Sequence, residues 1–210
     1  MTIGTILLMI TGLLIYLGVA HRVLDRLYLT DTVAIIIIAL MIIGSFFDLT
    51  ISRNPLLTFN IGGALIPLLL SIYVFIKADS NRERIRTIIA VILTAAAIYV
   101  ISILLKDFGH GRDIIDPMYI FAISGGVIAY LLGRSRRASF IAGTLGFLLY
   151  NLFIFYRALT GDIKGEVRLG GAGVYDSIVI SGILALLLAE LLGESLERLS
   201  GGPSGRGGEE

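Results

Sequence analysis

The 210-residue sequence has no cysteine and no tryptophan, and only 16% of its residues are charged. The absence of cysteine excludes disulfides, thiolate metal sites and a cysteine nucleophile. The net charge of +1 offers no bulk attraction to nucleic acid, so we expect no nucleic-acid partner. Apolar surface takes the place of charge, because 56% of the residues are hydrophobic, against about 45–50% in an ordinary soluble domain.

The hydrophobic residues are gathered in long runs that short, charged connections separate. Runs of about 17–25 apolar residues match the hydrocarbon thickness of a bilayer. The gaps between charges predict seven membrane spans, at roughly residues 2–20, 32–47, 56–76, 87–105, 117–132, 138–156 and 169–189. The second and fifth runs are short, so six spans are the alternative. The expected fold class is all-α: a polytopic transmembrane helix bundle without strands, located in the cell membrane, with membrane lipids as its partners.

The distribution of Lys and Arg predicts the orientation of this bundle. More of them fall in the cytoplasmic connections when the N-terminus is outside and the C-terminus inside, as the positive-inside rule requires. We expect residues 1–192 to form the bundle. Residues 193–210 are rich in glycine and charge and poor in apolar side chains, so we expect a disordered cytoplasmic tail.

One carboxylate interrupts the last apolar run, "LGGAGVYDSIVISGILALLLAE" (residues 169–190). Asp176 lies seven residues past Leu169, about 10 Å below the outer end of a helix that starts there. A charged group in lipid costs at least ~2.5–3.5 kcal/mol, so such residues usually face the bundle interior and have a function. The glycines before Asp176 weaken the helix. The alternative is therefore a helix that begins only near Asp176, with this residue as its N-cap.

Two amides fall at a similar predicted depth, Asn60 in the third span and Asn151 in the sixth. Lipid-exposed amides are unfavourable, so we expect Asn60, Asn151 and Asp176 to converge. Pro67 removes a backbone donor and frees the carbonyl of Gly63, which could coordinate a cation. Glycines such as Gly173 let a ligand approach the backbone. The predicted binding residues are Asp176, Asn151, Asn60, Gly63 and Gly173.

Other small residues predict packing. The segments "AGTLG" (residues 142–146) and "SGG" (residues 124–126) are typical of close helix–helix contacts in membranes. The two histidines, His21 and His110, are far apart and outside the predicted spans, so we expect neither a bound metal nor a cofactor.

Three segments carry a resemblance to a known family: "NIGGALIPLLLSIY" (residues 60–73), "AGTLGFLLYNL" (residues 142–152) and "LGGAGVYDSIVISGILALLLAE". The chain resembles an uncharacterised family of prokaryotic multi-pass membrane proteins that carries a domain-of-unknown-function label. The resemblance implies a shared membrane architecture and no established activity. An acid often follows the Gly-Thr-Leu-Gly segment in that family, whereas Asn151 occupies this region here.

A weaker resemblance is to the presenilin and signal-peptide-peptidase class of intramembrane aspartyl proteases. These proteases pair a Tyr-Asp in one helix with a Gly-x-Gly-Asp in the next. Here Tyr150 precedes Asn151, and Gly171 and Gly173 precede Asp176 with two additional residues between. This resemblance implies a catalytic Asp176, with Asp48 as the partner that replaces the missing second acid.

Three hypotheses of function follow. The first is an outward-facing polar site within the bundle that handles a small cation or solute, because carboxylate, amide and carbonyl oxygens suit a hard cation or a proton. The second is an aspartyl-protease-like protein, degenerate because Asn151 stands where the second acid is expected. The third is a non-catalytic membrane scaffold in which Asp176 caps a helix.

Overall fold

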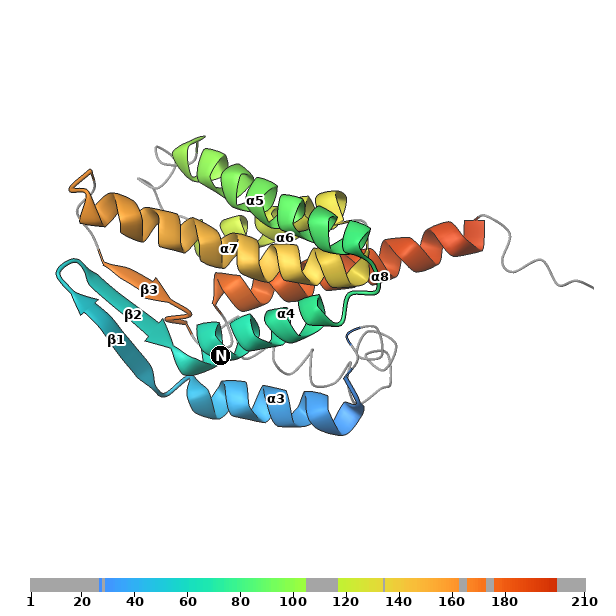
Figure 1. Ribbon diagram of the computed structural model, residues 1–210, viewed down its shortest axis with the longest axis horizontal. Helices are drawn as coiled ribbons and strands as arrows, with labels where there is room; N and C mark the ends of the chain where they lie inside the picture. Colours follow the sequence, from blue (N-terminus) through green and yellow to red (C-terminus); the bar gives the residue numbers. More distant parts are fainter. Residues whose placement is uncertain are drawn as a thin grey trace, which may run out of the picture.

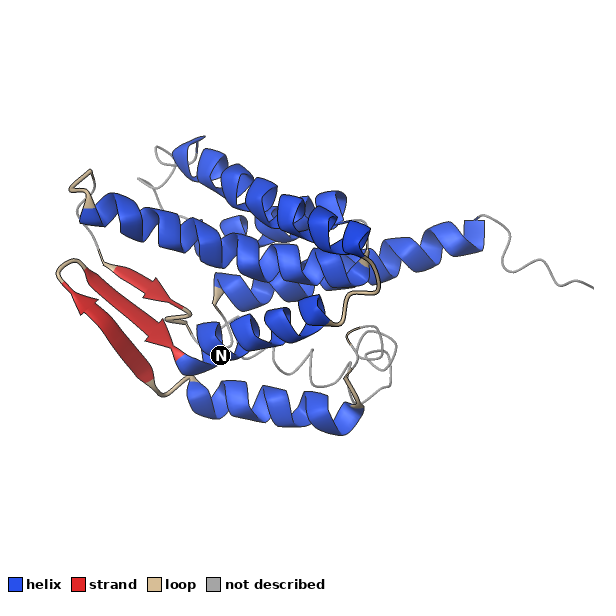
Figure 2. Ribbon diagram, viewed as in Figure 1, coloured by secondary structure: helices blue, strands red, loops and turns tan. Residues whose placement is uncertain are grey.

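Helices make up most of the chain in the computed structural model, which describes residues 27, 29–104, 117–133, 135–162, 166–172 and 176–199 (Figures 1 and 2). Six α-helices lie within these residues: α3 (Asp31–Gly44), α4 (Ile66–Ile76), α5 (Asn81–Leu104), α6 (Pro117–Gly133), α7 (Arg136–Leu159) and α8 (Ser177–Leu199). A π-helical turn, η1 (Ile61–Leu65), leads directly into α4. Three strands complete the structure: β1 (Asp48–Arg53), β2 (Leu56–Asn60) and β3 (Val167–Leu169).

The helices α5, α6, α7 and α8 form the centre of the bundle, α4 packs on α7, and α3 lies outside against η1 and α4. Glycines bring the central helices together. A Cβ at Gly143 of α7 would lie 2.7 Å from the carbonyl oxygen of Ser181, and one at Gly146 would lie 2.8 Å from a methyl of Thr94. A Cβ at Gly125 of α6 would lie 2.9 Å from the Ser181 hydroxyl. These contacts confirm both small-residue segments as helix–helix contact surfaces.

Successive helices run in alternating directions, so the bundle has two distinct ends (Figure 1). One end holds the start of α5, the start of α7 and the last part of α8. An ion pair between Arg136 and Glu190, 2.5 Å long, fixes this end of the α7–α8 pair. The opposite end holds the start of α8 and the sheet, and this sheet end contains the candidate residues Asp48, Asn60 and Asp176.

The sheet corrects the predicted all-α class. It has the order β1-β2-β3, with β2 antiparallel to β1 and parallel to β3. The hydrophobic run predicts the first turn of a membrane helix at residues 56–60, and these residues form β2 instead. The β-branched and aromatic residues in β1 and β2 favour strands, and Asn54-Pro55, joined by a cis peptide bond, forms the turn between them.

Two helices also begin later in the sequence than predicted. The third predicted span becomes helical only at Ile61, and the seventh only at Ser177. In both cases the preceding residues pair in the sheet or form its loop, which leaves Asn60 and Asp176 directly before a helix. Helix α8 continues to Leu199, past the boundary expected at residue 192. The first predicted span and residues 200–210 lie outside the described residues.

Two of the described helices, α5 and α7, are long and apolar enough to cross a membrane. Four apolar segments of 10–17 residues accompany them. The inner face of the sheet packs on this bundle through one apolar cluster, which contains Leu57, Val167, Leu169, Ile98, Phe147, Leu148 and Ile178. Asp176 lies two residues before Ile178, so the cluster positions the candidate carboxylate at the junction of sheet and bundle.

Candidate functional site

Asp176 occupies the N-cap position of α8, and it is 8% exposed. Its Oδ1 accepts a hydrogen bond from the backbone N–H of Ile178 at 3.0 Å, and its Oδ2 accepts one from Ala172 at 3.4 Å. An ionised carboxylate can accept about four hydrogen bonds. The described residues supply only these two donors and no basic side chain. The alternative interpretation of Asp176 as a helix cap is therefore confirmed, with acceptor capacity to spare.

The segment between β3 and α8, whose described residues are 170–172 and 176, is called the Asp176 loop here, and it lies against η1 at Gly170. Gly170, directly after β3, has a φ of +71°, which is a left-handed conformation that favours glycine. A Cβ at Gly170 would lie 2.4 Å from the carbonyl carbon of Gly63 and 2.5 Å from the nitrogen of Ala64. Glycines at both positions thus allow direct backbone contact between the Asp176 loop and η1.

Asp176 lies in the loop ahead of α8, outside the helices. Burial raises the pKa of Asp176 from 3.8 to about 6, and the backbone hydrogen bonds from Ile178 and Ala172 lower it less than burial raises it. Several charged residues on the neighbouring elements make contacts of their own, and burial is the dominant effect on Asp176. Arg168 pairs with Glu166 at 2.9 Å, Arg157 pairs with Asp162 at 3.7 Å, and Asp48 accepts a hydrogen bond from the side-chain amide of Asn60 at 2.9 Å.

A pH dependence of stability follows. Because the folded protein holds the Asp176 proton more tightly than the unfolded chain, this stabilisation is complete below about pH 4 and is lost as pH rises through about 6. The shift of about two pH units corresponds to about 3 kcal/mol. We expect Asp176→Asn, which keeps a capping side chain, to be more stable than wild type at pH 7.5 and equal to it at pH 4. Thermal unfolding of detergent-solubilised protein, followed by circular dichroism, measures this difference. A constant difference between the two proteins at both pH values would contradict the prediction.

Asn60 is 2% exposed and joins three elements. Its Oδ1 accepts from the N–H of Gly63 at 2.8 Å, so it caps η1. Its Nδ2 donates to the carbonyl of Ser45 at the end of α3 and to Oδ1 of Asp48, both at 2.9 Å. The structure therefore brings Asn60, Asp48 and Gly63 together. Only the second lone pair of the Asn60 carbonyl is left for a ligand.

Asn151 lies on α7, half-buried, at the sheet end. The antiparallel α7–α8 register, set by Gly143 against Ser181 and by Arg136 against Glu190, places Asn151 at the end of the bundle where α8 begins. No hydrogen bond joins its side chain to Asp176 or Asn60 within the described residues. Asn60, Asn151 and Asp176 share one end of the bundle, and the direct contact that the sequence predicts among them is not seen within the described residues. Gly173 lies outside the described residues.

The protease hypothesis needs a second carboxylate beside Asp176. Asp48 was the predicted partner, and its carboxylate accepts from Asn60 instead. Within the described part of the chain no contact joins Asp48 to Asp176. The described residues therefore give no geometric support to a catalytic pair of Asp48 and Asp176.

Buried hydroxyls are a feature that sequence reasoning did not single out. Five fully buried Ser and Thr side chains have no hydrogen-bond partner among the described residues: Ser71, Thr94, Ser139, Thr144 and Ser181. Thr144 and Ser181 lie in the α7–α8 contact, between Asp176 and the Arg136–Glu190 pair. Of the five, only Thr144 lies in one of the two small-residue segments, and that pattern predicts packing without indicating a buried polar group.

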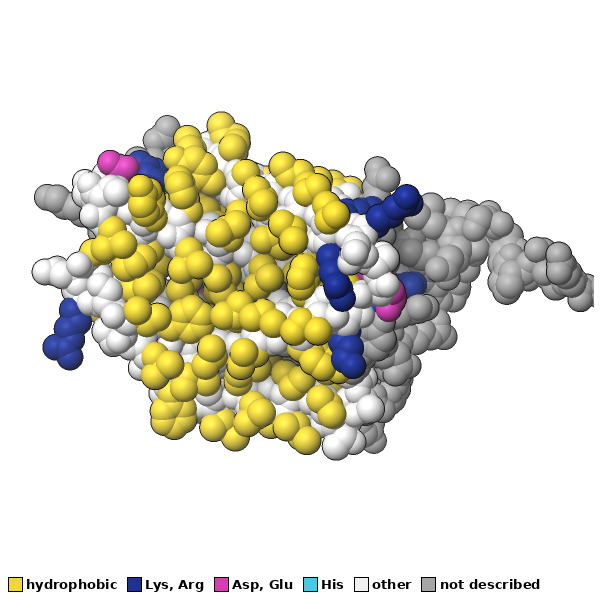
Figure 3. Space-filling view, in the orientation of Figure 1, with side chains coloured by type: hydrophobic (Ala, Val, Ile, Leu, Met, Phe, Trp, Pro, Cys, Tyr) yellow, Lys and Arg dark blue, Asp and Glu magenta, His cyan; other side chains and the backbone are white. Residues whose placement is uncertain are grey.

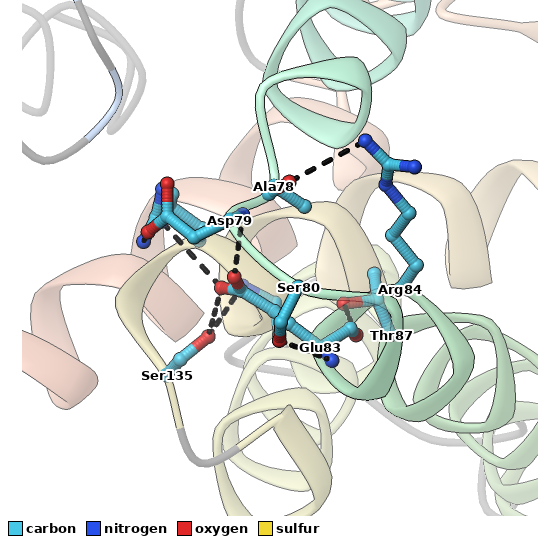
Figure 4. A network of polar contacts seen from close by, with 9 residues as sticks. Ala78, Asp79, Ser80, Glu83, Arg84, Thr87 and Ser135 are labelled. Carbon is cyan, nitrogen blue, oxygen red and sulfur yellow. Dashed lines mark hydrogen bonds and ion pairs between the residues drawn. The ribbon is translucent and has the colours of Figure 1, made fainter.

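A second polar network lies at the opposite end, around the α4–α5 connection (Figure 4). Ser80 accepts from the N–H of Glu83 at 3.2 Å and caps α5, and Arg84 donates to the carbonyl of Ala78 at 3.4 Å. Glu83 also accepts from the hydroxyl of Ser135 at 3.2 Å, while Arg137 pairs with Asp79 and Glu83. This network ties the start of α5 to the start of α7 and closes that end of the bundle with paired charges.

The chemistry available at the sheet end is that of one buried carboxyl group. Within the described residues no group of three acidic or histidine side chains could hold a metal ion. A buried carboxylate with spare acceptor capacity can bind a proton or a small cation.

Comparison with known proteins gives one match. A family model described as "Protein of unknown function (DUF1614)" matches residues 45–188, which include β1, the sheet, the central bundle and Asp176. No curated protein and no solved structure matches the chain.

Proposed function

The chain belongs to the DUF1614 family, and from this premise we propose that it is a multi-pass membrane protein that binds a proton or small cation at Asp176. The observation that carries the proposal is a buried carboxyl group at the junction of sheet and bundle, with two backbone donors and no basic partner among the described residues. The site lies within the matched region, so the proposal concerns the part of the chain that defines the family.

The surface supports a membrane location. Hydrophobic side chains cover the middle of the face in Figure 3, and Lys, Arg, Asp and Glu lie at its two ends. Helix α5 is the clearest case, because only 28% of its most apolar 18-residue stretch is buried inside the protein. Its exposed large side chains are Ile85, Ile88, Ile89, Ile92, Leu93, Val100, Ile103 and Leu104. Soluble proteins rarely expose an apolar patch of this extent, whereas lipid solvates it.

The charge distribution supports the orientation with the C-terminus inside. Among the described residues, the elements at the end opposite the sheet carry Lys77, Arg82, Arg84, Arg86, Arg136 and Arg137, and those at the sheet end carry Arg53, Arg157 and Arg168. The positive-inside rule places the first group in the cytoplasm. Six alternating helices, preceded by the predicted span at residues 2–20, then give seven spans with the N-terminus outside. The Asp176 site faces outward in this arrangement.

The choice of aspartate supports a role in proton or cation binding. Asparagine caps helices about as well as aspartate does, and it would avoid the cost of a buried charge at neutral pH. A cap alone therefore does not require an acid at position 176. Binding of a proton or a cation does require one, because an amide neither titrates near neutral pH nor neutralises a cation.

The test is ion flux into proteoliposomes, followed with an internal pH dye under an imposed proton gradient and, in parallel, under Na⁺ or K⁺ gradients. We expect the wild type to conduct one of these ions and Asp176→Asn to reduce the flux about ten-fold or more, because the amide neither takes up a proton near neutral pH nor neutralises a cation. Asp162→Asn is the control, because it removes an exposed carboxylate from the same end of the bundle. Flux equal to that of empty liposomes, or equal in wild type and Asp176→Asn, would refute the proposal.

The membrane scaffold is a second candidate, which the capping bond from Ile178 favours. In a scaffold Asp176 acts only through this bond. Asp176→Asn would then leave flux and assembly unchanged, and Asp176→Ala would cost about 1 kcal/mol of stability through loss of the cap. The two substitutions in the same liposome and unfolding assays separate a cap from an ion site.

A further inference from the structure

Strand β1 is the outer strand of the sheet, and within the described residues β2 is the one strand that pairs with it (Figure 1). Five of its six residues are exposed and Ser52 is half-buried. The exposed side chains include Ile51, at 64%, and Leu49. Phe46, at 83%, and Phe47 are exposed immediately before the strand. Within the described residues, this is an apolar edge strand whose outer backbone groups have no strand to pair with.

An open apolar edge of this kind is unfavourable both in lipid and in water. In lipid, an open sheet edge leaves backbone N–H and C=O groups without partners, and exposed edges of this kind do not occur in the hydrocarbon region. In water, an apolar edge strand pairs with other strands unless charges, proline or a bulge protect it. The protecting devices on β1 are the bulge between Thr50 and Ser52 and the charges of Asp48 and Arg53 at its two ends, and Leu49, Thr50 and Ile51 between them are uncharged. The edge therefore requires a covering strand whether or not the proposed membrane location holds.

The sequence of β1, Asp-Leu-Thr-Ile-Ser-Arg, indicates which strand fits. Opposite charges stand at its two ends, with apolar and hydroxyl side chains between them. Antiparallel pairing of β1 with a second β1 sets Asp48 opposite Arg53 twice, whereas parallel pairing sets like charges together. Opposite-charge cross-strand pairs stabilise a sheet and like pairs destabilise it. Arg53 has no partner among the described residues of its own chain.

We propose that two copies of this chain form a two-fold dimer by antiparallel pairing of their β1 strands. The two sheets then join into one sheet of six strands, with β1 of each copy at the centre. The two-fold axis then passes between Thr50 and Ile51, at the bulge that leaves Ile51 without a partner on β2, and every contact is made twice. Phe46 and Phe47 lie beside the joined strands and are covered with them.

A charge-exchange experiment tests the pairing with differently tagged copies co-expressed in membranes. Arg53→Glu alone sets two acidic side chains opposite each other at both ends of the paired strands, and Asp48→Lys alone sets two basic side chains there. A mixture of the two variants restores two opposite-charge pairs. We expect each variant alone to lose dimer about ten-fold relative to wild type and the mixture to recover it, since repulsive pairs exclude the wrong partner. Arg53→Glu keeps the Asp48–Asn60 hydrogen bond in both copies, so a recovery by the mixture relative to Arg53→Glu alone cannot come from that bond.

Disulfide cross-linking gives an independent readout, because the chain has no cysteine of its own. Thr50→Cys in one tagged copy and Ile51→Cys in the other should form a disulfide-linked heterodimer on mild oxidation. Ile92→Cys in both copies is the control for random collision, as Ile92 is exposed on α5. The dimer is overturned if cross-linking is no stronger than at Ile92, if the charge mixture recovers nothing, or if residues 1–26 of the same chain protect the thiol introduced at position 51. Failure of the dimer would leave ion binding at Asp176 untouched, since the liposome assay measures the latter separately.

Discussion

Replacing Gly170 by alanine is expected to destabilise the protein by about 3 kcal/mol or more. Two costs add at this position. A left-handed backbone, φ +71° here, costs a residue with a Cβ about 1–2 kcal/mol. The new Cβ would also lie 2.4 Å from the backbone of Gly63, and overpacking of this kind typically costs about 1–3 kcal/mol. Because the obstacle is backbone, no side-chain rotation relieves it. The Asp176 loop has to move away from η1.

Gly161 is a matched control for this substitution. It has a φ of +80°, and a Cβ there would meet nothing within 4 Å. Gly161→Ala should therefore show the conformational cost alone, about 1–2 kcal/mol. The difference between the two midpoints of thermal unfolding, followed by circular dichroism in detergent, isolates the contact between the Asp176 loop and η1. Equal losses for both alanine variants would show that this contact contributes nothing to stability.

The Asp176 loop also shows which features of the site the sequence predicts. The glycines before Asp176 indicate that a helix could start as late as residue 176, and capping by Asp176 follows as one alternative. The depth argument placed Asn60, Asn151 and Asp176 at one end of the bundle. Helical rise and hydrophobic runs are local properties of the chain, so they determine depth well. Hydrogen bonding between residues from different helices depends on rotation and tilt, which these runs do not determine.

The strands were missed for a different reason. The segment Leu56–Asn60 is apolar and runs without a charge into Ile61, so hydropathy alone merged β2 with the following helix. Two local signals were available. Asn54-Pro55 is a turn signal between two segments rich in β-branched or aromatic residues, and Asn60 is an N-cap residue followed by Gly62 and Gly63. The pairing of β2 with Val167–Leu169 joins residues more than 100 positions apart, which the local pattern did not predict.

Replacing Gly182 by alanine is the second substitution for which we expect a large loss of stability, because this glycine lies very close to a side chain of the neighbouring helix. A Cβ at Gly182 of α8 would lie 2.1 Å from Oγ1 of Thr144 on α7. Threonine is β-branched, so rotation about χ1 replaces the hydroxyl with a methyl or swings it into the preceding turn of the helix. The two helices must therefore separate. Since α7 packs on α5, α6 and α8 together, separation disturbs the whole centre, and we expect Gly182→Ala to cost about 3 kcal/mol.

Thr144→Ala supplies the internal control. It removes Oγ1, after which the nearest atoms to the new Cβ are Cβ of residue 144 at 3.3 Å and Cε2 of Phe140 at 3.4 Å. The Thr144 hydroxyl is buried without a partner among the described residues, so its loss alone should cost little. The double variant Gly182→Ala/Thr144→Ala should regain most of the lost stability, with a coupling of about 2 kcal/mol in a double-mutant cycle. If the double variant is no more stable than Gly182→Ala, the helices are not held at the distance that this glycine allows, and the buried hydroxyls between them have room for other partners.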